Sequence, residues 1–164
     1  MKALLAIILI TLLISCKSQK PVDFDKIEFN SSRCFGNCPV ISFQLKKDKS
    51  ILLSRTRASR SKVGGDATTI DMTEYLEGTV NQNIFNQLLA ELAKTDTVSF
   101  KGTNCCDAPL KTVIAYYNGK RKYFETMFPP QEGERLIAIL YEISNSENLK
   151  ATTKRFIFIN DSIK

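Results

Sequence analysis

The stretch KTVIAYYNGKRKYFET, residues 111–126, decides the fold of this chain. Two runs of alternating, partly apolar residues flank the dipeptide Asn118-Gly119. Asn-Gly suits a two-residue turn whose central residues take positive φ, and such a turn joins neighbouring antiparallel strands. Residues 111–117 and 120–126 are therefore predicted to form a β-hairpin.

A second hairpin is predicted earlier in the chain. The run VISFQLK, residues 40–46, places Ile41, Phe43 and Leu45 on one face of a strand and polar residues mostly on the other. Residues 47–49 supply a polar turn, and residues 50–57 return as the partner strand.

The remaining segments give weaker signals. Short strands are expected at residues 26–30, 67–72 and 97–101, and at 155–159, where a last strand could add to an edge. Residues 58–66 are basic and serine-rich and contain Gly64-Gly65. This composition predicts an exposed, mobile loop.

Two stretches carry apolar residues at helical spacing. One runs through residues 84–93, with Thr79 or Asn81 as a possible cap, and the other through residues 131–144. Hairpins followed by helices predict an α+β fold, in which an antiparallel sheet built from hairpins has two helices packed on one face.

The sharpest motif is a short cysteine loop, Cys34-Phe35-Gly36-Asn37-Cys38-Pro39. Gly36 can take positive φ there, and Pro39 stiffens the exit into a strand, so a Cys34–Cys38 disulfide is favoured. Two other pairings stay open. Both loops could be cross-linked through Cys105 and Cys106, or these two neighbours could bond to each other, which we expect to be strained.

A functional use of these thiols has less support. A redox pair normally has two residues between its cysteines at a helix start, whereas three separate Cys34 from Cys38 before a strand. A zinc site needs two spaced pairs, which the adjacent Cys105 and Cys106 do not readily provide. The role of this second thiol pair is left unassigned, and no cofactor or metal is expected.

The pattern around these loops resembles a Bacteroidetes-type bacterial lipoprotein family, known as a domain of unknown function. Its motif Cys-aromatic-Gly-x-Cys-Pro matches residues 34–39, and its later Asp-x-Pro motif matches Asp107 and Pro109, before an Asn-Gly hairpin. The resemblance covers roughly residues 25–148. Two departures are Asp48-Lys49, where the family usually has Asp-Gly, and Cys105-Cys106, which lies outside its pattern.

The resemblance implies a shared Cys34–Cys38 bridge and an envelope address, without an established activity. Together with the residues themselves, it predicts a possible binding loop. Its members are Phe35, Gly36, Asn37, Pro39, Asp107 and Pro109.

The N-terminus has the order of an export signal. Lys2 precedes an apolar stretch over residues 3–14, which is shorter than the roughly 20 residues that span a bilayer. The stretch ends at Ser15-Cys16, which resembles the lipobox of bacterial lipoproteins. In that family the cysteine is lipidated and becomes the first residue of the mature chain, and two or more acyl chains anchor it stably.

These observations divide the chain into a signal peptide (residues 1–15), a lipidated Cys16 with a tether to residue 24, and one globular domain over residues 25–160. The expected partner through the lipid is a membrane. Lys17 is not the aspartate that signals inner-membrane retention in enteric bacteria, so the resemblance favours the outer membrane, facing the periplasm.

The chain contains no histidine, which excludes Ser-His-Asp and Cys-His catalysis and histidine-bound metals. Its net charge of +6 is more typical of a solvated surface than of a polyanion site, and no nucleic-acid-binding motif is present. We expect a non-enzymatic binding or structural module that contacts an envelope protein or component. The alternative is a thiol-active (redox) envelope protein that uses Cys34 and Cys38.

Overall fold

The computed structural model describes residues 22–35, 38–63, 66–95, 104–156 and 158. The hairpin predicted at residues 111–126 is present as β5 (Lys111–Tyr117) and β6 (Lys120–Thr126). Its turn residues have the expected positive φ, 52° at Asn118 and 67° at Gly119. The Asn-Gly signal therefore gives the correct turn and register.

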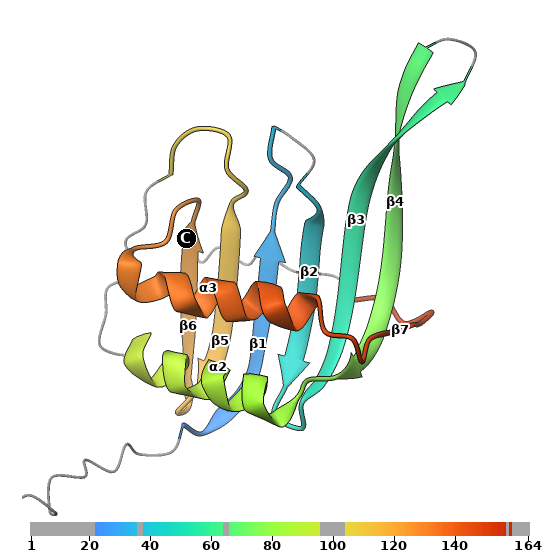
Figure 1. Ribbon diagram of the computed structural model, residues 1–164. Helices are drawn as coiled ribbons and strands as arrows, with labels where there is room; N and C mark the ends of the chain where they lie inside the picture. Colours follow the sequence, from blue (N-terminus) through green and yellow to red (C-terminus); the bar gives the residue numbers. More distant parts are fainter. Residues whose placement is uncertain (1–21, 36–37, 64–65, 96–103, 157, 159–164) are drawn as a thin grey trace, which may run out of the picture.

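A seven-stranded antiparallel sheet contains this hairpin (Figure 1). The other strands are β1 (Phe24–Ser31), β2 (Val40–Lys46), β3 (Ser50–Val63), β4 (Asp66–Thr79) and β7 (Lys150–Ala151). The order across the sheet is β6-β5-β1-β2-β3-β4-β7. β1 thus lies between the two predicted hairpins and pairs with β2 on one side and β5 on the other.

The helices α2 (Gln82–Thr95) and α3 (Gln131–Ser144) lie side by side on one face of the sheet (Figure 1). Asn81 caps α2, because its Oδ1 accepts a hydrogen bond from the Asn83 N–H at 2.8 Å. The α+β class and the two-helix layer predicted from the sequence are confirmed.

The core fills the space between the helices and the sheet. The Phe29 ring in β1 lies 5.4 Å from Phe43 and 5.3 Å from Tyr141 of α3. Such aromatic pairs stabilise by roughly 0.5–1.5 kcal/mol beyond their buried area. Further fully buried side chains come from every layer: Ile27, Leu45, Leu53, Val113, Leu88, Leu92, Leu136 and Leu140.

The prediction of a mobile loop at residues 58–66 is wrong. β3 and β4 pair without a break from Ser50↔Thr79 to Val63↔Asp66, and form a long ribbon that rises beyond the rest of the sheet (Figure 1). Backbone pairing with β4, which the local composition does not reveal, holds residues 58–63 in a strand. Gly64-Gly65 lies outside the described residues.

The chain ends also differ from expectation. Phe24, which we assigned to the tether, is the first residue of β1 and is buried. The last strand is Lys150–Ala151, which pairs with Leu76 and Glu77 at the edge of β4, whereas Arg155 and Phe156 are not in a strand. The strand expected at residues 97–101 falls outside the described part, as do residues 157 and 159. Over the part of the chain that is described, no helix has the length and apolar character to cross a bilayer.

Candidate binding site

One end of the sheet carries both cysteine loops. The pairing of Ser31 with Lys111 places the end of β1 beside the start of β5. The Ser32 N–H donates to the Leu110 carbonyl at 2.9 Å, and the Leu110 N–H donates to Ser32 Oγ at 2.9 Å. We call this region the loop end. It comprises the described residues of 32–39, 104–110 and 127–130, and the part of the β3–β4 ribbon beyond β2.

The first cysteine loop is closed by a disulfide. The Cys34 and Cys38 sulfurs lie 2.00 Å apart, with 5.5 Å between the Cα atoms. Phe35, inside this short loop, is 91% exposed. Pro39 is partly buried, and Gly36 and Asn37 lie outside the described residues. The disulfide therefore presents an aromatic side chain to solvent on a covalently closed loop.

An ion pair joins this loop to the ribbon. Arg33 donates to Asp71 Oδ2 of β4 at 2.6 Å, and both side chains are about half exposed. Ile70 and Met72 flank Asp71 in β4, and both project from the opposite side of that strand. The ion pair therefore ties the Phe35 loop to β4 on the face of the strand opposite to the Ile70 and Met72 side chains.

Exposed apolar side chains are spread across the loop end. Among the described residues, four large apolar side chains are exposed: Phe35 (91%), Met72 (65%), Ile70 (51%) and Phe128 (44%). Phe128 follows β6, whose last residue, Thr126, pairs with Lys111 at the start of β5. All four thus lie at the same end of the sheet, although they come from three separate segments.

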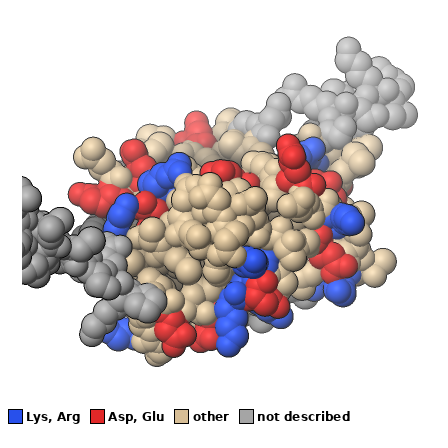
Figure 2. Space-filling model, turned by 60° about the horizontal axis from the view of Figure 1, so that its bottom comes forward, with Lys and Arg blue, Asp and Glu red and all other residues tan. Residues whose placement is uncertain are grey.

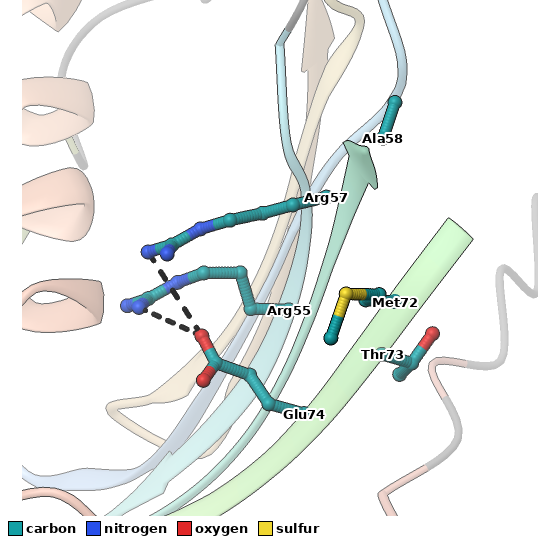
Figure 3. Close-up of a pocket in the computed structure, with 6 residues that line it drawn as sticks. All are labelled: Arg55, Arg57, Ala58, Met72, Thr73 and Glu74. Atoms are coloured by element: carbon teal, nitrogen blue, oxygen red, sulfur yellow. Dashed lines mark hydrogen bonds and ion pairs between the residues drawn. The ribbon is translucent and has the colours of Figure 1, made fainter. Parts of the chain in front are cut away.

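A pocket of about 390 Å³ lies on the ribbon at this end (Figure 3). Its lining comprises Arg55, Arg57, Ala58, Met72, Thr73 and Glu74. Arg55 is largely buried: it donates to Glu74 Oε1 at 3.1 Å and to the Ser144 carbonyl at the end of α3. Arg57, with its side chain 63% exposed, lies 3.9 Å from the same carboxylate oxygen, so its guanidinium remains accessible to an anionic group.

Lys111 supports the opposite side of the loop end. Its ammonium donates to the Met127 carbonyl and lies 5.7 Å from the centre of the Phe128 ring. Burial lowers the pKa of Lys111, because the charged form is partly removed from water. This side chain therefore fixes the segment that carries Phe128.

The second cysteine loop is held at its first described residue. Asn104 Oδ1 accepts a hydrogen bond from the Met127 N–H at 2.9 Å. Cys105 and Cys106 are exposed free thiols, Asp107 is exposed in the turn with Cys106, and Pro109 is partly buried. The predicted binding-loop residues that the structure describes thus share one end of the sheet. Cys16 lies outside the described residues.

The apolar residues of the ribbon and the segment after β6 were not among the predicted site residues. Ile70 and Met72 belong to the short strand expected at residues 67–72, for which no role was predicted. The alternation of apolar and polar residues at 70–74 indicates a strand. The position of that strand at the loop end depends on its pairing with β3, which the local sequence does not reveal.

Across the described ranges, three or more potential metal ligands are nowhere grouped together. Figure 2, which brings the end opposite the loop end forward, shows lysine and arginine interspersed with aspartate and glutamate around an uncharged centre. The charge of the face seen there is therefore mixed and does not favour a polyanion.

Comparisons with known proteins give a family and no activity. Neither the curated proteins nor the solved structures contain a match to this chain. A family model described as "Domain of unknown function (DUF6438)" matches residues 25–146. The match runs from β1 through the end of α3 and includes both cysteine loops. This chain therefore belongs to the DUF6438 family of domains of unknown function.

Proposed function

We propose that this chain is a lipid-anchored, non-enzymatic protein of the bacterial cell envelope that docks onto an envelope protein through its loop end. The observation that carries the proposal is that all four exposed large apolar side chains of the described residues lie at this end of the sheet. Phe128 and Met72 lie on opposite sides of the strand order, so they suit a partner with an extended surface.

The loop end has the features of a preorganised surface. Phe35 is an aromatic residue, the type that dominates many interfaces when a partner pocket encloses it. Its loop is closed by the Cys34–Cys38 disulfide and tied to β4 through Arg33 and Asp71. A constrained loop loses little conformational entropy on binding, so more of the contact energy contributes to affinity.

The ribbon pocket suggests the chemistry of the partner. The exposed Arg57 guanidinium stands beside the apolar Met72 side chain in the same pocket. Arginine binds carboxylates through parallel hydrogen bonds. A protein segment that presents an apolar side chain next to an aspartate or glutamate would suit this pair.

The position of the N-terminus favours a partner away from the membrane. Asp23 lies beside the β5–β6 turn, since its N–H donates to Asn118 Oδ1 at 3.0 Å. That turn is at the opposite end of the sheet from the loop end, as the course of β1 shows (Figure 1). With lipid on Cys16, the loop end would thus face away from the anchoring bilayer by about the length of β1, roughly 25 Å.

Site-specific photo-crosslinking in native envelopes tests the binding proposal. We expect a photoreactive phenylalanine analogue at Phe35 or Met72 to crosslink one discrete envelope protein. The matched control is the same analogue at Lys120, an exposed position in the β5–β6 hairpin at the opposite end. Equal crosslinking from Lys120, or none from Phe35 and Met72, contradicts the proposal.

The lipid anchor is tested separately. The Cys16→Ser variant should lose incorporation of labelled palmitate and move from the membrane fraction to the soluble periplasmic fraction. A Ser15→Thr variant, which keeps the thiol, should remain in the membrane fraction. Unchanged membrane attachment of Cys16→Ser would contradict the anchor and leave the binding proposal standing.

The alternative function, thiol chemistry at Cys34 and Cys38, predicts that this bridge cycles between reduced and oxidised forms. Acid quenching and thiol trapping of cells measure the fraction of each form. A bridge that stays fully oxidised in growing cells and after mild oxidant or reductant stress contradicts the alternative.

A further inference from the structure

We propose that Cys105 and Cys106 are a redox-modification site, which a protein or low-molecular-weight disulfide of the envelope converts into a vicinal disulfide. Neither the family match nor the proposed binding function assigns a role to these two residues. The proposal is independent of the docking partner, because it concerns the covalent state of the chain itself.

The two thiols are already in contact. Both are free and exposed, and the Cys106 thiol donates a hydrogen bond to Cys105 Sγ over a sulfur–sulfur distance of 2.9 Å. Adjacent side chains on an extended chain point to opposite sides, which would hold the sulfurs well apart. Their contact therefore needs a local bend in the backbone.

Cys106 provides this bend. Its φ is +66°, in the left-handed region, whereas the other non-glycine residues with positive φ in the described part, Lys49 and Asn118, lie in hairpin turns. For a residue with a Cβ this conformation is unfavourable. Backbone strain at non-glycine residues is found preferentially at functional sites.

This geometry changes the expectation from the sequence. A bond between neighbouring cysteines was expected to be strained, because the backbone must turn sharply to bring the sulfurs together. Here the turn at Cys106–Asp107 already exists with both thiols free, so part of the conformational cost is present before any bond forms. Closing the bond then needs a smaller rearrangement than an extended dipeptide would.

The reaction is ordinary thiol–disulfide exchange. The thiolate of one cysteine attacks a disulfide RSSR, which forms a mixed disulfide and releases one RS⁻. The second cysteine, as its thiolate, attacks the protein-side sulfur, closes the Cys105–Cys106 bond and releases the second RS⁻. In sum, two protein thiols are oxidised, one RSSR is reduced to two RSH, and no further electron acceptor is needed.

The contact between the two thiols also affects the rate at which the Cys105–Cys106 disulfide forms. The hydrogen bond that shares a proton with the Cys106 sulfur and the repulsion between two neighbouring thiolates raise the pKa of the Cys105 thiol. Exchange proceeds through the thiolate, so we expect the bond to form faster as pH rises. The exposure of both residues gives a disulfide reagent direct access.

Peptide mapping can test the proposal without interference from the other loop. Trypsin cleavage after Lys101 and Lys111 releases GTNCCDAPLK, and cleavage after Arg33 and Lys46 releases CFGNCPVISFQLK. Each peptide holds one cysteine pair. A vicinal bond, a crossed bond between the loops and free thiols therefore give three different masses.

The experiment uses the full chain with Cys16→Ser, equilibrated in glutathione buffers from fully reduced to fully oxidised and then quenched with iodoacetamide. We expect GTNCCDAPLK to carry two labels in reduced buffer. In oxidised buffer it should carry none and be lighter by two hydrogen atoms than the unlabelled dithiol. Two labels at every ratio, a stable glutathione adduct, or a crosslink to CFGNCPVISFQLK would overturn the proposal.

The Cys105→Ser variant is the matched control. Its remaining Cys106 thiol has no neighbour to close the ring, so the peptide should accumulate one glutathione adduct in the same oxidised buffer. Because both positions are exposed, circular dichroism should show the variant to be folded. If the parent chain accumulates the adduct to the same extent as Cys105→Ser, the vicinal bond does not form.

Discussion

Arg33 and Asp71 join two segments that are 38 residues apart in the sequence: the guanidinium donates to the carboxylate at 2.6 Å. The pair links the disulfide-closed loop to β4 beside Ile70 and Met72. Both side chains are about half exposed, and exposed ion pairs typically contribute only about 0–1 kcal/mol to stability. Its main consequence is therefore the position of the Phe35 loop and not the stability of the fold.

Replacing Asp71 with asparagine should loosen this loop without unfolding the protein. We expect the free energy of unfolding of Asp71→Asn to fall by less than about 1 kcal/mol, while amide hydrogen exchange at residues 33–35 becomes faster. Glu77→Gln is the matched control, because it breaks a second exposed pair of β4, with Lys154 at 2.7 Å. Exchange at residues 33–35 that responds equally to both variants would contradict the link.

Arg55 and Arg57 both approach the Glu74 carboxylate, but we expect replacement of the two residues to lower the free energy of unfolding by very different amounts. The Arg55 side chain is 10% exposed and also donates to the Ser144 carbonyl at the C-terminal end of α3. Removing it leaves a carboxylate and a helix-end carbonyl without this donor, which predicts a loss of about 2–4 kcal/mol for Arg55→Met. Methionine keeps much of the apolar stem, so the loss reports mainly on the polar contacts.

Arg57→Met is the control for this comparison. Arg57 approaches Glu74 only to 3.9 Å and is mostly exposed, so we expect a change below about 1 kcal/mol. Urea unfolding of both variants measures the difference. Equal losses would show that the contact with α3 contributes little.

The contacts of Asp48 predict how the stability of the fold changes with pH in the acidic range. Its Oδ1 accepts hydrogen bonds from the Ser50 N–H at 2.9 Å and from Ser50 Oγ at 2.6 Å, which hold the β2–β3 turn. These bonds lower the pKa of Asp48 below its ordinary value of 3.8. The carboxylate therefore makes its full contribution to stability well above pH 3.8, and this contribution disappears as the pH falls through the lowered pKa.

The Asp48→Asn variant isolates this contribution. The difference in unfolding free energy between the parent chain and the variant should be constant between neutral pH and about pH 5, and should shrink as the pH is lowered further. Urea unfolding across this range, with Asp71→Asn as a second carboxylate variant, measures it. A difference that grows on acidification would have the wrong sign for a lowered pKa.

The local parts of the fold could be predicted because their signals are local. Asn118-Gly119 specifies a turn type through positive φ, and VISFQLK at residues 40–46 specifies a strand through alternation. The ribbon could not be predicted in the same way. Residues 59–62 are polar, and they form a strand only because β4 satisfies their backbone hydrogen bonds.

The candidate site likewise has one part that could be predicted from the sequence and one part that could not. The Cys34–Cys38 loop and its exposed Phe35 could be located from the motif, because five residues define a covalent ring. Met72 and Arg57 become neighbours only through the register of β3 and β4. No single-residue signal indicates that pairing, so the pocket on the ribbon was missed.

Two glycines, Gly78 and Gly119, should respond to substitution for opposite reasons. Gly78 in β4 has ordinary backbone angles, but an added Cβ would lie 2.4 Å from the Asn148 carbonyl oxygen, before β7. Gly119 has open space around it, but its φ is +67°. We expect Gly78→Ala to cost about 1–3 kcal/mol through steric overlap and Gly119→Ala about 1 kcal/mol through backbone strain.

Asparagine separates the two causes, because it tolerates the left-handed conformation better than alanine but occupies more space. Gly119→Asn should therefore be at least as stable as Gly119→Ala, whereas Gly78→Asn should be less stable than Gly78→Ala. Thermal and urea unfolding of the four variants give the two comparisons. If asparagine is worse than alanine at both positions, space rather than backbone conformation limits Gly119. If it is better at both, the close approach of Asn148 to β4 does not constrain the fold.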